Sequence, residues 1–285
     1  FLAAFLGTGV LSDIFFIALK IPDSFKASVS EETFNSAYIP KFLKFEDLSD
    51  HKKQYQFARK ILVVSSLVIM PLIIVIEVFM PSVIKIVAPG IINPDAFNQL
   101  VQISRIIFPY LLFIIISSVF VGTLNAKNKF ALGAGLPIIL NLAMILSMVS
   151  FPVFGETRII FLSWSVVVGG AIQSLFLFVA VDKTFWKVFF SKKRNYVSTK
   201  RFFQLIWPTF LSSTLLQVNM LVVLLLASYE TGAVSYLYYA ERIYWLPLSL
   251  IAIAISTVLI PNLSNALRAS NKVLALDTQS QAYKY

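Results

Sequence analysis

Charged residues interrupt several stretches of this chain that are otherwise apolar. The first case is the neighbouring pair Glu241 and Arg242, which lies within residues 238–247 and before an apolar run to Pro261. An ionised side chain at the centre of a bilayer costs about 2.5–3.5 kcal/mol on insertion scales, so such residues usually face a protein interior or a water-filled cavity. The two side chains point about 100° apart on a helix, so each needs its own partner. For Arg242 we weigh a cationic cavity wall against a structural ion pair with another helix, and we favour the cavity.

A second charged group comprises Lys20, Asp23 and Lys26 on one predicted helix that begins at Asp13. At 3.6 residues per turn, these residues and Asp13 occupy an arc of about 140°. Successive members of the group are three residues apart, which places them side by side on the helix surface. Snorkelling toward water explains Lys26 near a helix end. It explains Lys20 poorly, because apolar runs precede this lysine and Pro22 follows it, so we predict a cavity-facing group.

Glu77 and Arg105 form a third group, at matched positions in two successive apolar segments. Glu77 precedes the connection near Ile86, and Arg105 follows its end near Ala96, by about the same number of residues. In a helical hairpin the two side chains would lie at similar depth. We predict a buried ion pair with a structural role, in which a single neutralisation leaves an unpaired charge.

The elements that must position these residues are membrane-spanning helices. Of the 285 residues, 58% are hydrophobic and only 13% are charged, whereas a soluble domain has roughly 45–50% apolar and about 25% charged residues. Apolar stretches of the length that crosses a bilayer as a helix recur along the chain. The sequence therefore predicts an all-α, polytopic transmembrane protein with about eight helices.

The predicted helices group into a complete first lobe, a linker and the start of a second lobe. Residues 1–182 would form the N-terminal lobe, and residues 201–285 would begin the C-terminal lobe. Between them, residues 183–200 interleave aromatic and basic side chains, which indicates an amphipathic segment at the cytoplasmic membrane surface; an ordinary basic loop is the alternative. The expected helices are 1–6, 13–26 resuming as 34–45, 61–84 with an interruption at Pro71, 97–124, 131–149, 159–181, 202–227 and 233–263.

Basic residues fall almost entirely in alternate connections. The net charge of +10 comes from the connections after the second, fourth, sixth and eighth helices, while the others hold only Lys85 and Arg158. This alternation is what the positive-inside rule requires of cytoplasmic loops. We therefore interpret the excess charge as membrane topology and expect no nucleic-acid partner.

Signals of enzymatic chemistry are lacking in the sequence. There is no cysteine and one histidine, and no paired carboxylates, nucleophile elbow or phosphate loop. We expect neither catalysis nor a cofactor or metal ion. The chain starts in what reads as the middle of a helix and stops without a natural end, so we expect a piece of a longer protein.

An ordered series of short motifs resembles the MurJ/MviN lipid II flippases. The series extends over essentially the whole chain and runs Leu11-Ser-Asp-Ile-Phe-Phe-Ile-Ala-Leu-Lys-Ile-Pro22, Phe34-Asn-Ser-Ala-Tyr-Ile-Pro40, Val87-Ala-Pro-Gly90, Ile106-Ile-Phe-Pro-Tyr110, Leu124-Asn-Ala-Lys-Asn-Lys-Phe130, Leu136-Pro-Ile-Ile-Leu-Asn-Leu-Ala-Met144, Trp164-Ser-Val-Val-Val-Gly-Gly170, Tyr238-Tyr-Ala-Glu-Arg242 and Leu259-Ile-Pro-Asn-Leu-Ser264.

The resemblance implies a fourteen-helix transporter of the exporter superfamily that also contains multidrug and polysaccharide flippases. It implies a monomer in the bacterial inner membrane that moves lipid II, an undecaprenyl-pyrophosphate-linked precursor of peptidoglycan, by alternating access around a cationic cavity. Arg242 matches a cavity arginine of the family, and Lys26 stands where the family usually has another. Basic side chains suit a pyrophosphate, although lysine lacks the bidentate fork of arginine.

Several positions depart from the family pattern. Asp23 stands where the family often has Asn, Ala27 replaces the second residue of a basic pair, and Trp245 replaces an acidic residue. These departures leave open a drug or polysaccharide-lipid exporter of the same fold. A membrane enzyme or scaffold for lipid-linked sugars is a further alternative, although no surface cluster of carboxylates or histidines supports it.

Overall fold

The fold is described here from a computed structural model, which describes residues 2–28, 31–47, 51–150, 156–191 and 199–247. Within these ranges the regular secondary structure is entirely α-helical. The prediction of an all-α chain is therefore confirmed. The part of the predicted eighth helix beyond residue 247 and residues 192–198 of the predicted linker lie outside the described residues.

The helices follow one another with short connections. Their bounds are α1 (Leu2–Leu6), α2 (Val10–Ser28), α3 (Glu31–Asp47), α4 (His51–Val78), α5 (Met80–Val87), α6 (Pro94–Ile107), α7 (Tyr110–Asn125), α8 (Phe130–Ala134), α9 (Leu136–Ser150), α10 (Glu156–Ala180), α11 (Lys183–Phe189) and α12 (Lys200–Ala227). Residues 233–247 are helical as well.

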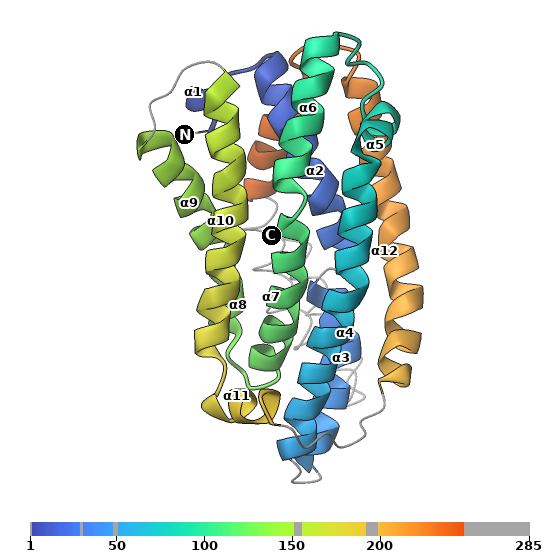
Figure 1. Ribbon diagram of the computed structural model, residues 1–285, viewed down its shortest axis with the longest axis vertical. Helices are drawn as coiled ribbons and strands as arrows, with labels where there is room; N and C mark the ends of the chain where they lie inside the picture. The colour runs from blue at the N-terminus through green and yellow to red at the C-terminus, as the bar shows by residue number, and fades with distance from the viewer. Residues whose placement is uncertain (1, 29–30, 48–50, 151–155, 192–198, 248–285) are drawn as a thin grey trace, which may run out of the picture. The chain divides into compact units, whose positions relative to one another are not determined.

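The chain divides into two compact units, residues 1–234 and residues 235–285. Within the first unit the long helices run side by side, and the short helix α11 lies across one end of the bundle (Figure 1). Four described segments are long and apolar enough to cross a membrane: Lys52–Val78, Pro94–Asn125, Phe130–Ser150 and Thr157–Ala180. The chain is therefore a multi-pass membrane protein.

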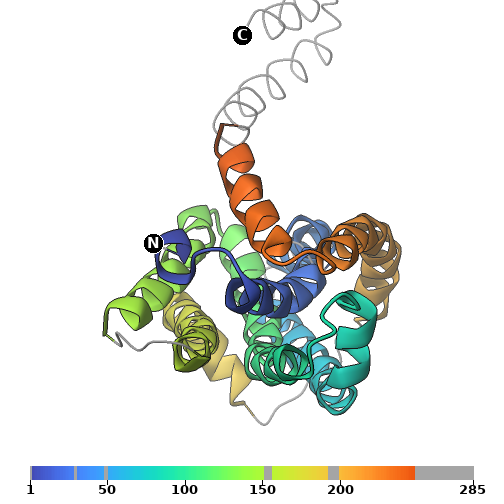
Figure 2. The same ribbon diagram turned by 90° about the horizontal axis from the view of Figure 1, so that it is seen from above.

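Helix α2 lies at the centre of the first unit, where it packs against α6, α7, α10 and α12 (Figure 2). Its segment Ile14–Leu19 is apolar around the whole helix, so no face of it can be left in water. Every side chain from Ser12 to Leu19 is buried. The other helices of the unit therefore enclose this half of α2 on all sides.

Prolines break the long segments at some positions and not at others. Helix α4 continues through Pro71, which the sequence predicted as an interruption, and ends at Val78, shortly before Pro81 near the start of α5. Pro71 is exposed, so its ring does not press against a neighbouring helix. The segment from α6 to α7 breaks at Phe108 and Pro109. Membrane helices tolerate proline where neighbours accommodate the lost hydrogen bond, and sequence alone did not tell these sites apart.

Most of the described basic residues of the first unit lie at one end of the bundle. Lys44, Lys52, Lys127, Lys129 and Lys187 belong to the α3–α4, α7–α8 and α10–α11 ends (Figure 1). The opposite end carries Lys85 and Arg158. At the basic end, α11 buries Phe185 and Val188 and exposes Lys183 and Lys187. This two-sided helix agrees with the amphipathic pattern of the sequence, and its place at a membrane surface stays a prediction.

Candidate functional site

The predicted cationic group lies on the second half of α2, where the enclosure of that helix opens. Lys20 and Asp23 are half-buried, and Lys26, one turn further on, is exposed. The Ser24 hydroxyl, between them, donates to the Lys20 carbonyl at 2.8 Å. The charged side chains of α2 therefore lie in its second half, and they become more exposed with distance from the buried first half.

Aromatic residues at the α6–α7 break hold this half of α2. The rings of Phe25 and Phe108 meet edge to face, with centroids 5.9 Å apart. Tyr110 begins α7 and is 1% exposed. The break at Pro109 thus lies between two buried aromatic residues, of which Phe108 packs on the charged half of α2.

Tyr110 lies in turn against Gly170 of α10. A Cβ atom added at Gly170 would approach two ring atoms of Tyr110 to less than 3.0 Å, a distance at which neighbouring atoms overlap. The absence of a side chain at Gly170 therefore permits the close packing of α10 on α7. Its neighbour Gly169 likewise lies close to Leu140 and Ala143 of α9.

Asp13, in the first turn of α2, makes a long-range bond that sequence reasoning missed. Its carboxylate oxygen Oδ2 accepts a hydrogen bond of 2.6 Å from the backbone N–H of Gly232. Gly232 has a φ of 86°, in the left-handed region that favours glycine, and it immediately precedes the helical residues 233–247. Asp13 thus begins the predicted helix and also binds the turn after α12.

A second contact at the same end joins the α5–α6 connection to the turn after α12. The backbone N–H of Gly90 donates to the Ser228 hydroxyl at 3.0 Å. A Cβ at Gly90 would come within 3.0 Å of the backbone of Ser228 and Tyr229. The first turn of α2 and the α5–α6 connection are therefore both held to residues 228–232.

Arg242 lies in the second unit, residues 235–285. Its Nη2 atom donates to the Tyr238 hydroxyl at 3.0 Å, and its guanidinium lies 4.9 Å from the centroid of the Tyr238 ring. Arg242 is exposed and Glu241 is half-buried. A cavity shared by Arg242 and Lys26 stays a prediction, because these residues belong to different units.

Arg105 approaches Glu77, as the hairpin model predicts. The Arg105 Nε atom donates to the backbone carbonyl of Glu77 at 3.2 Å. The Glu77 oxygen Oε1 is buried and has no hydrogen-bond partner among the described residues. The two helices are therefore tied through the main chain at Glu77, and pairing with its carboxylate stays a prediction.

An unpredicted polar cluster lies at the basic end of the bundle. The Asp182 carboxylate accepts from Lys127 and, at 2.9 Å, from the Tyr55 hydroxyl; Lys129 lies 3.6 Å from the other carboxylate oxygen. The hydrogen bond from Lys127 lowers the pKa of Asp182. Burial opposes the charge of Lys127, but its bonds to Asp182 and Tyr55 outweigh that effect and raise its pKa. The cluster joins the α7–α8 and α10–α11 connections to the start of α4.

With this geometry in hand, comparison with known proteins gives the family. The family model described as "Lipid II flippase MurJ" matches residues 2–285. The chain belongs to the MurJ lipid II flippase family. This confirms the resemblance seen in the sequence motifs.

Individual MurJ relatives match over the full chain. It is 32% identical to the probable lipid II flippase MurJ of Rhizobium meliloti (strain 1021), over 100% of this chain and 54% of the relative. It is 31% identical to that of Rickettsia prowazekii (strain Madrid E), over 100% of this chain and 56% of the relative. The chain thus spans about half the length of these MurJ relatives.

Solved structures agree on the fold. A lipid II flippase MurJ in an inward closed conformation matches with a TM-score of 0.75 and 25% identity, over 94% of this chain and 55% of that one. An inward-facing multidrug resistance MATE family transporter of the MOP superfamily matches with a TM-score of 0.68 over 96% of this chain and 65% of that one. At 15% identity the second likeness shows the fold alone.

Proposed function

We propose that the protein containing this chain moves lipid II from the cytoplasmic to the outer leaflet of the bacterial inner membrane by alternating access. The observation that carries the proposal is the match of the MurJ family model to residues 2–285. Membership of a flippase family also argues for transport rather than catalysis. We further propose that the transporter acts as a monomer, without a cofactor.

The chemistry of α2 suits the head group of such a substrate. A pyrophosphate carries concentrated negative charge, and ammonium or guanidinium groups bind it through charge-assisted hydrogen bonds. Lys20 and Lys26 supply such groups, and both lie on the accessible half of α2. Asp23, on the same half, would favour hydroxyl or amide donors of the substrate. In this proposal Arg242 adds the bidentate donor that lysine cannot provide, and Glu241 lines the same cavity.

The other end of α2 suits the closed side of an alternating-access cycle. Asp13 holds the Gly232 backbone, and Gly90 holds Ser228. Residues 228–232 connect α12 to the helix that carries Arg242. Opening of the outer side would require that both contacts break, so we infer that they stabilise the state open to the cytoplasm.

The lobe assignment of the sequence fits this cycle and is part of the proposal. Residues 1–182 would form the first lobe, residues 183–200 a cytoplasmic linker, and residues 201–285 the beginning of the second lobe. A drug or polysaccharide-lipid exporter of the same fold is the second candidate. A neutral or acidic cavity would favour it, whereas the described half of α2 supplies two lysines and one aspartate.

Complementation of a strain depleted of its lipid II flippase tests the function. The full-length protein should restore growth, and Arg242→Ala and Lys26→Ala should each abolish or strongly reduce rescue. Lys26→Arg should rescue as well as the parent, because it keeps the charge and adds the fork. Lys85→Ala, which removes an exposed cation on α5, is the matched control and should rescue fully. Full rescue by both Arg242→Ala and Lys26→Ala, at equal protein levels, would contradict the cavity assignment, and failure of the parent would contradict the function.

A further inference from the structure

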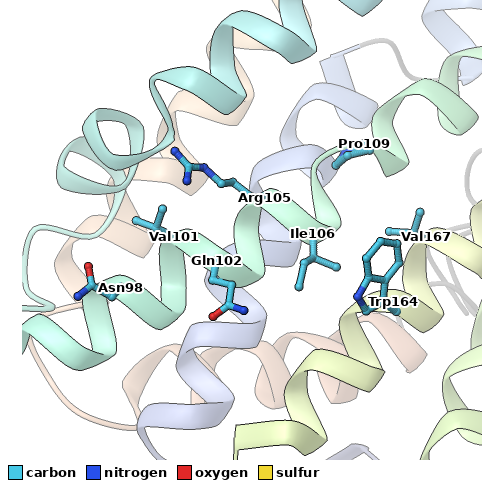
Figure 3. Close-up of a pocket in the computed structure, with 8 residues that line it drawn as sticks. All are labelled: Asn98, Val101, Gln102, Arg105, Ile106, Pro109, Trp164 and Val167. Carbon is cyan, nitrogen blue, oxygen red and sulfur yellow. The ribbon is translucent and has the colours of Figure 1, made fainter.

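A lateral groove separates α6 from α10 in the first unit (Figure 3). Its volume is about 570 Å³. The lining side chains are Asn98, Val101, Gln102, Arg105, Ile106 and Pro109 from α6 and the α6–α7 break, together with Trp164 and Val167 from α10. The groove is thus large enough for part of a small amphiphile, and it has a polar wall and an apolar wall.

The polar wall is unusual for a spanning helix. Asn98, Gln102 and Arg105 are all exposed, and their spacing of four and three residues places them on one face of α6. The outward residues of the neighbouring spans are apolar, for example Leu67 and Val68 of α4 and Leu175 and Val179 of α10. Polar side chains exposed within a spanning segment are expensive unless a polar partner meets them. A ligand with its own polar group therefore suits this face better than hydrocarbon alone.

The depth of the polar face decides which polar group can reach it. The span Pro94–Asn125 has 32 residues, or about 48 Å as a helix, whereas the hydrocarbon core is about 30 Å thick. Centring the span leaves about 9 Å beyond the core at each end. Asn98 then lies at headgroup level, Gln102 just below the core boundary, and Arg105 about 8 Å inside it, within reach of an extended side chain that snorkels.

We propose that this groove binds a glycerophospholipid from the leaflet at the N-terminal end of α6. The Arg105 guanidinium, whose Nε atom donates to the Glu77 carbonyl, would meet the lipid phosphate with its terminal nitrogens. Gln102 and Asn98 would donate to the phosphate and ester oxygens. Ile106, Pro109 and Val167 would pack along one acyl chain, beside Trp164, which is 53% exposed.

The chemistry favours a lipid over a dissolved anion. Five of the eight lining residues are apolar, and a free phosphate ion beside them would gain no contact and would lose its hydration. Basic pockets between spanning helices are a known means of recognising lipid headgroups. The groove lies outside the α2 cavity of the proposed function, so the proposal of lipid binding here does not depend on lipid II transport.

Native mass spectrometry of the full-length protein tests the proposal. The protein would be stripped of lipid in detergent, titrated with dioleoyl phosphatidylglycerol, and scored for the fraction that carries one bound lipid. Arg105→Gln should lower the affinity for the first lipid about tenfold, since a hydrogen bond to a charged group is lost. Val167→Trp should lower it as strongly by filling the groove while leaving Arg105 in place. Lys85→Gln removes an exposed cation of the neighbouring α5 and should bind like the parent.

Each remaining outcome decides against the site. If the fraction of Val167→Trp that carries one lipid equalled that of the parent, the proposal would be overturned. This holds even if Arg105→Gln failed to fold. If Lys85→Gln lost as much affinity for the first lipid as Arg105→Gln, the lipid would be attracted by positive charge in general and not by this groove. Displacement of the lipid by dissolved glycerol phosphate would assign the groove to anions in general, and a dimer in place of the lipid adduct would assign it to a second copy of the protein.

Discussion

The Asp13 carboxylate and the Gly232 backbone N–H meet at 2.6 Å across 219 residues of sequence. Asp13 is 6% exposed, so this bond forms away from water. It fastens the start of α2 to the turn before the next helix. A carboxylate that accepts a backbone N–H at the beginning of a helix also interacts favourably with the helix dipole.

Asp13→Ala should destabilise the protein by about 1–2 kcal/mol, because it removes a capping acceptor and leaves a buried N–H unpaired. Asp13→Asn keeps an acceptor oxygen and should lose less. Thermal unfolding of the purified full-length protein measures both. Asp95→Ala is the control, since it removes an exposed carboxylate from the first turn of α6 and should change stability little. A larger loss of thermal stability in Asp13→Asn than in Asp13→Ala would contradict the bond between Asp13 and Gly232.

Gly90→Ala should weaken the junction between residues 88–93 and 228–229. The new methyl group would overlap the backbone of Ser228 and Tyr229, and backbone atoms cannot rotate away as a side chain can. We expect a cysteine placed at exposed Tyr229 to react faster with a membrane-impermeant maleimide in this variant. Gly135→Ala is the matched control, because a Cβ there would meet its nearest neighbour at 3.4 Å. Equal labelling rates in both variants would count against the junction.

Gly170→Ala should destabilise the packing of α10 on α7 by about 1–3 kcal/mol, the usual range for overpacking. Its methyl group would overlap the ring of Tyr110. Adding Tyr110→Leu to Gly170→Ala should recover part of the loss, because the smaller side chain frees the space. Gly169→Ala should cost less, since its nearest neighbour is the flexible end of the Leu140 side chain. Thermal midpoints of the four proteins decide the order.

Asp182 should make stability depend on pH at the basic end of the bundle. Its pKa is lowered in the folded protein by the bond from Lys127, so its contribution is present above the unfolded pKa and is lost as the pH falls through the folded pKa. The raised pKa of Lys127 gives the opposite limit, with loss as the pH rises through that value. The stability difference between the parent and Asp182→Asn should therefore shrink in acid. A difference that stays constant between neutral and acid pH would exclude the ionic contribution.

Glu77→Gln and Arg105→Gln should each destabilise the helix pair, and the double variant should lose less than the sum of the two. The reason is that either single change leaves one charge in the span without its counterpart. A double-mutant cycle on thermal stability measures this coupling. If the stability loss of the double variant equalled the sum of the two single losses, Arg105 would interact only with the Glu77 carbonyl. The predicted pair with the Glu77 carboxylate would then be wrong.

The sequence predicted local features well, because they depend on composition and spacing within one helix. The apolar runs anticipated the spanning segments, and the matched positions of Glu77 and Arg105 anticipated their approach. Contacts set by tertiary closure were missed. Asp13 carries a good N-cap side chain wherever it stands, and nothing near it in sequence points to Gly232. Similarly, Lys127 and Asp182 read as loop residues until folding brings them together with Tyr55.

The sequence also did not predict which prolines break a helix. Proline usually interrupts a helix, yet α4 continues through Pro71 and ends at Val78. At Pro109 the chain does break, beside buried Phe108 and Tyr110. Whether a proline breaks a membrane helix depends on what packs around it, and this information belongs to the neighbours rather than to the proline.

The bond between Asp13 and Gly232 also has a consequence for the order of biosynthesis. A ribosome that adds about 5–20 residues per second makes Asp13 roughly ten seconds or more before Gly232 exists. During that interval α2 enters the membrane with its carboxylate lacking the partner it has in the finished fold. Assembly of the first unit is therefore completed only when translation has passed α12, and a nascent chain cut before that point has to hold α2 without its closing bond.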